Sequence, residues 1–145
     1  MSGIDFSNVK IKGLEPINFY KNEKYRHIGI SSSFSTLVPM YKELLREVIN
    51  NKVDENFHDM PLSTEQTQQV KSIFEHQIDK TLLVHEPYQE GYQELHFPWK
   101  GETYVMMTLA HTPKNRRILD FHEIYLIAKE CLSENKPMYL SIEQI

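Results

Sequence analysis

The sequence is poor in cysteine, in glycine and in long apolar runs, and each shortage excludes a class of protein. The single cysteine, Cys131, excludes an internal disulfide and any zinc site built from several thiolates. The five glycines do not cluster, so neither common type of glycine-rich phosphate-binding loop is present. No apolar run approaches the roughly 20 residues that a membrane-spanning helix needs.

The first 20 residues also lack the apolar core of a secretory signal, which predicts a soluble protein of the cytoplasm. Apolar residues make up 40% and charged residues 25% of the 145 residues, a balance typical of a folded domain. No linker rich in proline, glycine or serine divides the chain. We therefore expect a single domain over residues 1–145.

Apolar residues recur at helical spacing in three stretches of the chain. Ser63 and Gln66 predict a capping box at the start of the second stretch. Asp120 is the expected N-cap of the third helix, and Asn135 is the expected left-handed residue at its end. The expected helices cover residues 36–51, residues 64–80 and residues 120 to about 134.

Several shorter segments have the composition or alternation of β-strands. They are residues 4–6, 9–11, 25–30, 81–85, 92–99, 102–111 and 138–142. Lys100 and Gly101 form a two-residue hairpin loop, which sets Phe97 opposite Tyr104. Residues 104–110 are apolar on both faces, so we expect a central strand there. The order of elements predicts an α+β fold, with about three helices packed on an antiparallel or mixed sheet.

Charge is distributed unevenly along the chain, whose net charge is −4. Residues 54–102 contain ten carboxylates and only three lysines, and the rest of the chain has a small positive excess. Such asymmetry informs about binding partners rather than about the fold. It disfavours nucleic acid as a partner and favours a basic protein.

Carboxylates alternate with tyrosines in one short segment of this acidic region. Tyrosine is enriched at binding hot spots, and surrounding carboxylates steer a basic partner towards the surface. We therefore predict a protein-binding site there, made of Glu86, Tyr88, Glu90, Tyr92 and Glu94.

These features predict a non-catalytic protein that inhibits a basic partner. The general profile is similar to that of bacterial toxin immunity proteins, which are small, acidic α+β proteins without a catalytic motif. The resemblance is to a class, since no motif of a particular family is present, and it implies a nuclease-like toxin as the partner. We expect no cofactor, no membrane partner and no catalytic residue, and the oligomeric state stays open.

The histidines suggest an alternative, a small metal-dependent enzyme. His85, His96 and His111 fall on three successive expected strands, where their imidazoles could converge on a metal ion. Glu94 and His96 are two residues apart and therefore share one face of an expected strand. They are the one strand pair that we consider as an acid and a base.

A basic loop suggests a second alternative, the binding of a nucleotide or nucleic acid. Lys114, Arg116 and Arg117 lie between an expected strand and the third helix, where they could hold a phosphate. Three charges without interleaved aromatic residues make a small footprint for nucleic acid.

Overall fold

The computed structural model describes residues 2–10, 25–32, 37–107 and 113–144, without the side chains of residues 2, 31–32 and 113–116. Its fold is α+β, as predicted. The strands are β1 (Ser2–Ser7), β2 (His27–Ser32), β3 (Phe57–Pro61), β4 (Glu94–Trp99), β5 (Glu102–Met107) and β6 (Tyr139–Glu143). The helices are α2 (Leu37–Leu45), α3 (Thr64–Leu83) and α4 (Pro113–Ser133).

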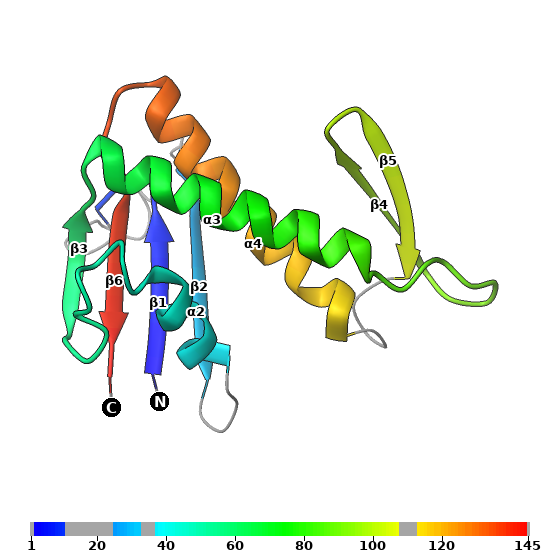
Figure 1. Ribbon diagram of the computed structural model, residues 1–145, viewed down its shortest axis with the longest axis horizontal. Coiled ribbons are helices and arrows are strands. Elements are labelled where there is room, and N and C mark those ends of the chain that lie inside the picture. The colour runs from blue at the N-terminus through cyan, green and yellow to red at the C-terminus, as the bar shows by residue number, and fades with distance from the viewer. Residues whose placement is uncertain (1, 11–24, 33–36, 108–112, 145) are drawn as a thin grey trace.

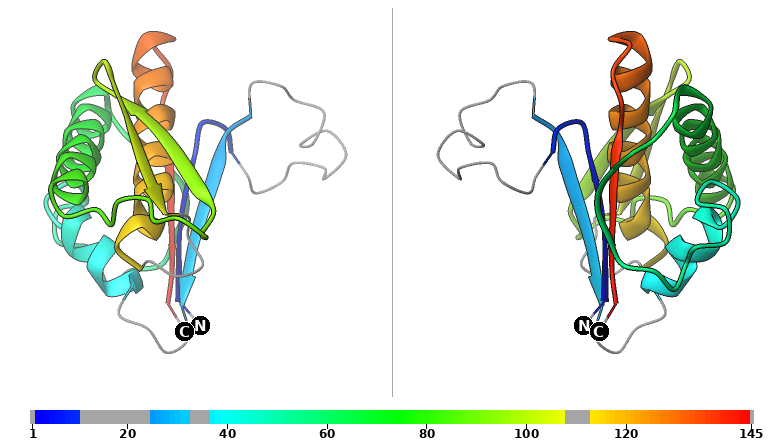
Figure 2. Two further views of the ribbon diagram at one scale, coloured as in Figure 1. Left: turned by 90° about the vertical axis from the view of Figure 1, so that its right-hand side faces the viewer. Right: turned by 90° about the vertical axis from the view of Figure 1, so that its left-hand side faces the viewer.

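The described strands form two antiparallel sheets. The larger sheet has the order β2-β1-β6-β3, and the smaller one pairs β4 with β5. The helices cover one face of the larger sheet (Figure 2), and the β4–β5 hairpin extends beyond it at the end of α3 (Figure 1). Among the described helices, none is long and apolar enough to cross a membrane.

The core lies between the larger sheet and the helices, and Phe74 of α3 is near its centre. The ring of Phe74 lies 5.8 Å from that of Phe6 on β1, 5.9 Å from that of Tyr41 on α2 and 5.8 Å from that of Phe121 on α4. All four side chains are buried. One aromatic cluster therefore connects the sheet to all three described helices.

Several local predictions are confirmed. Ser63 accepts a hydrogen bond from the backbone of Gln66, whose side chain accepts one from the backbone of Ser63, which completes the capping box. Phe97 pairs with Tyr104 in the predicted hairpin register. Asn135 has a φ of 53°, the left-handed conformation expected where α4 ends.

The expected strand over residues 81–85 is wrong, because α3 continues to Leu83. Val70, Phe74, Ile78 and Leu82 are all buried and recur every four residues, so the apolar stripe of α3 runs through the predicted strand. Helical burial against the core decides between two conformations that this short apolar stretch permits.

The predicted start of the third helix is also wrong. α4 begins at Pro113, where a missing N–H costs nothing in a first turn, so Asp120 lies inside the helix and not at its N-cap. β3 was not predicted, because its alternation is broken where the register shifts between Phe57 and Met60. The first expected helix, over residues 36–51, ends earlier than predicted: α2 ends at Leu45, and a turn follows it.

Candidate functional site

A short third segment joins the β4–β5 hairpin. The backbone N–H of Met107 donates to the carbonyl of Glu86, and that of Tyr88 donates to the carbonyl of Val105. Pro87 forms an antiparallel bridge to Met106 between these two bonds. β5 therefore has a paired neighbour on each side, as expected of a central strand. The three segments form a ribbon that is not part of the larger sheet.

Two rows of side chains share the outer face of this ribbon. Directly paired residues point to the same side of an antiparallel sheet, so Tyr88, Val105 and His96 form one row across the three segments. Glu86 and Glu94 belong to the next row, on either side of β5. Residues distant along the chain are therefore brought together around β5.

Exposed apolar side chains are frequent in and beside this part of the chain. Of the six large hydrophobic side chains that are exposed in the described residues, four belong to this region: Leu83 (85% exposed), Val84 (60%), Tyr92 (46%) and Val105 (40%). Leu83 and Val84 end α3 immediately before the segment that pairs with β5. A clustered apolar patch with a polar rim is typical of a protein interface.

Together these residues define what we call the ribbon surface: Leu83, Val84, Glu86, Tyr88, Glu90, Tyr92, Glu94 and Val105. All five residues of the predicted protein-binding site belong to it. Glu90, Tyr92 and Glu94 are exposed, whereas Glu86 and Tyr88 are half-buried. The loop that carries Glu90 and Tyr92 lies at one end of the longest axis of the molecule (Figure 1).

Sequence reasoning missed the apolar part of the ribbon surface. Leu83 and Val84 were assigned to a strand, and Val105 to a strand buried on both faces. The signal for Leu83 was present, because a helical stripe through Ile78 and Leu82 leaves the next residue outside it.

The inner face of the ribbon is fixed to the helices. The indole Nε1 of Trp99 donates to Asp79 of α3 at 2.8 Å, and this bond is the main cause of the lowered pKa of the Asp79 carboxyl. Lys100 lies 3.1 Å from both Glu75 and Asp79. Phe97 is buried, with its ring 5.0 Å from that of His122 on α4. These contacts hold the outer face in position.

The described residues do not form the metal site that was predicted from His85, His96 and His111. His85 follows α3 instead of lying on a strand, and its Nδ1 is 2.7 Å from the carbonyl oxygen of Leu82. His96 is exposed, with its Nε2 2.7 Å from Glu94. His111 lies outside the described residues. Within the described ranges, no group of three or more His, Cys, Asp or Glu side chains is placed to hold a metal ion.

The predicted basic loop is helical. Lys114, Arg116 and Arg117 belong to the first turns of α4, so the prediction of a loop is wrong. The Nη1 atom of Arg117 lies 3.4 Å from Asp120, one helical turn later. This ion pair offsets the charge of Arg117; the side chains of Lys114 and Arg116 fall outside the description.

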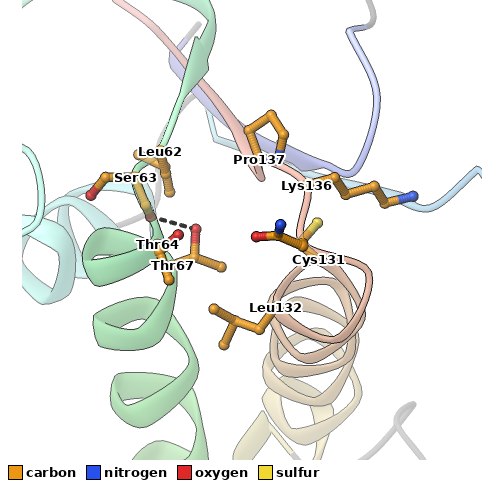
Figure 3. A pocket seen from close by; sticks show the side chains of 9 residues that line it. Leu62, Ser63, Thr64, Thr67, Cys131, Leu132, Lys136 and Pro137 are labelled. Atoms are coloured by element: carbon orange, nitrogen blue, oxygen red, sulfur yellow. Dashed lines mark hydrogen bonds between the residues drawn. The ribbon is translucent and has the colours of Figure 1, made fainter.

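Cys131 lines a cavity of about 230 Å³ between the start of α3 and the end of α4 (Figure 3). The residue is fully buried, and burial raises the pKa of its thiol to about 11. A thiol that stays protonated at neutral pH is a poor nucleophile. Cys131 is therefore a small hydrophobic side chain of the core.

The chain matches no protein family model, and no curated protein or solved structure is significantly similar to it.

Proposed function

We propose that this protein is a non-catalytic binding protein whose ribbon surface captures a basic partner protein and blocks it. The observation that carries the proposal is that four of the six exposed large hydrophobic side chains of the described residues lie on or beside the ribbon, among three glutamates. Leu83 and Val84 supply apolar area at the end of α3, and Tyr92 supplies a large ring with few rotatable bonds.

The charge of the region supports a basic partner. Glu86, Glu90 and Glu94 lie on the ribbon surface, within the segment of the chain that has ten carboxylates and three lysines. Lys100 is held by Glu75 and Asp79, so its charge is offset locally. A surface of one sign speeds the encounter with a partner of opposite sign, while the apolar contacts at its centre slow dissociation.

The proposal includes inhibition of the kind exercised by bacterial toxin immunity proteins, with a nuclease-like toxin as the partner. A nuclease binds an anionic substrate with a basic surface, and an acidic surface can cover it. An inhibitor of this kind acts in the cytoplasm and needs no cofactor.

The test begins with affinity capture from the native source and continues with the purified partner. Tyr88→Ala and Tyr92→Ala should each weaken the complex about tenfold or more, mainly through faster dissociation. Glu86→Lys and Glu90→Lys should mainly slow association, and this effect should shrink at high salt. Leu83→Ser should raise the dissociation rate. Surface-based binding kinetics measures both rates.

Glu55→Lys is the matched control, because it reverses an exposed carboxylate in the connection between α2 and β3. It should leave both rates close to those of the wild type. A captured partner that binds the tyrosine and glutamate variants as well as the wild type would show that the ribbon surface is not the binding site.

A further inference from the structure

A cleft of about 370 Å³ lies between the tip of the β4–β5 hairpin and α4. The hairpin contributes Trp99 and Lys100, and α4 contributes His122, Tyr125 and Lys129. The volume falls within the range of about 300–1,000 Å³ found for small-molecule sites. The cleft is on the inner side of the hairpin, whereas much of the ribbon surface occupies the outer face.

Three aromatic rings form a corner in this cleft. The rings of His122 and Tyr125, one helical turn apart on α4, are nearly parallel, with an interplanar angle of 17°. Trp99 stands almost perpendicular to both, at 74° to Tyr125 and 85° to His122. His122 stacks on one face of Tyr125, so a planar ligand ring could stack only on the other face of Tyr125, where it would lie nearly perpendicular to Trp99, a favoured aromatic geometry.

The corner is held in place before any ligand arrives. The hydrogen bond from Trp99 to Asp79 sets the orientation of the indole. Burial lowers the pKa of His122, which favours the neutral imidazole that packs against Phe97, Trp99 and Tyr125. Prior ordering of this kind reduces the entropic cost of binding.

Two lysines border the aromatic corner, and they differ in their partners. Lys100 lies 5.6 Å from the Trp99 ring, but Glu75 and Asp79 already offset its charge. Lys129 lies 6.0 Å from the Tyr125 ring and makes no ion pair with any residue that the structure describes. Lys129 is therefore the cation available to an anionic ligand.

We propose that this cleft binds a small aromatic phosphate, such as a mononucleotide. Its planar ring stacks on Tyr125 beside Trp99, and its phosphate pairs with Lys129, which lies over the same Tyr125 ring. The inference does not depend on the proposed function, because it concerns a different face of the hairpin and another class of ligand.

Trp99 is the one tryptophan of the chain, so its fluorescence reports directly on the cleft. Adenosine monophosphate is the probe, with adenosine and inorganic phosphate as the two partial ligands. The nucleotide should change the fluorescence in a saturable way, adenosine should bind about tenfold more weakly, and phosphate alone should produce little change. Calorimetric titration provides a second measurement that does not depend on light absorption by the base.

Lys129→Gln should reduce the affinity for the nucleotide to that for adenosine, because Lys129 is exposed and contributes only charge. Lys52→Gln, in the turn after α2, is the matched control and should bind like the wild type. Tyr125→Phe should retain binding and Tyr125→Leu should weaken both aromatic ligands. No saturable signal at millimolar nucleotide, or equal affinities in wild type and Lys129→Gln, would overturn the proposal.

Discussion

Single residues at the hairpin tip show how tertiary contacts select a residue that local preference disfavours. Lys100 and Gly101 both have positive φ, 50° and 84°, as a tight two-residue hairpin turn requires. Asparagine or aspartate suits the first of these positions better than lysine. The ion pairs of Lys100 with Glu75 and Asp79 connect the turn to α3, and they give a physical reason for a lysine there.

The same contacts predict a pH dependence at Asp79. The hydrogen bond from Trp99, followed by that from Lys100, lowers the pKa of the Asp79 carboxyl below its ordinary 3.8, although burial opposes them. A lowered folded-state pKa stabilises the protein at pH values above 3.8, and this contribution is lost as the pH falls through the lower folded-state pKa.

Trp99→Phe should therefore raise the pKa of Asp79 towards its ordinary value, as measured by NMR titration of the carboxyl carbon. The accompanying loss of stability at neutral pH should be about 1 kcal/mol or less from this bond, because water screens the partly exposed carboxylate. In a double-mutant cycle, Asp79→Asn should have a smaller effect in the Trp99→Phe protein. Equal effects in both backgrounds would contradict the coupling.

At the scale of elements, α3 is fixed at its start by local hydrogen bonds and at its end by burial. Gln66 contributes to the capping box, and its Nε2 also donates to the carbonyl of Val48, 2.8 Å away. The start of α3 is thereby tied to the connection after α2. At the other end, Leu82 keeps the helix on the core while Leu83 is left exposed.

Ser63→Ala should remove the hydrogen bond that the Ser63 hydroxyl accepts from the backbone N–H of Gln66 and destabilise the protein by about 1 kcal/mol. Urea unfolding followed by circular dichroism measures the change. Ser72→Ala, at an exposed position within the same helix, is the control and should change stability by less than about 0.5 kcal/mol, because alanine favours a helix more than serine does. Similar losses in both variants would argue against a specific role of the cap.

At the scale of the whole molecule, one aromatic cluster holds the sheet and helices together, and the inner side chains of the ribbon extend the same core. Phe74 contacts rings from β1, α2 and α4. The ribbon packs on α3 and α4 through Trp99, Lys100 and Phe97, and Met106 of β5 is fully buried in the same core. Changes to the outer face of the ribbon should therefore affect binding more than folding.

Phe74→Ala should cost about 3–5 kcal/mol, a large part of the about 5–15 kcal/mol that stabilises a typical domain. Phe74→Leu, which leaves a smaller cavity, should cost less. Leu83→Ala, on the same helix but 85% exposed, should cost less than about 0.5 kcal/mol. Differential scanning calorimetry would show the three variants in this order; a Phe74→Ala protein as stable as Leu83→Ala would exclude a central role for the cluster.

The sequence alone was sufficient for features that depend on residues close together in the chain. The capping box of Ser63 and Gln66, the left-handed Asn135 and the register of Phe97 with Tyr104 follow from local hydrogen bonding and turn geometry. The five residues of the predicted binding site were also chosen from their spacing and charge, and that site stays a prediction.

Only the tertiary structure decided where α3 ends, where α4 begins and what surrounds the predicted site. Leu82 is helical because it is buried against the core, and Val105 is exposed because β5 belongs to a separate ribbon. The pairing of residues 86–88 with β5 joins segments separated by β4 and its turn. Burial and backbone pairing between distant residues are collective properties of the packed chain, and for that reason local patterns could not specify them.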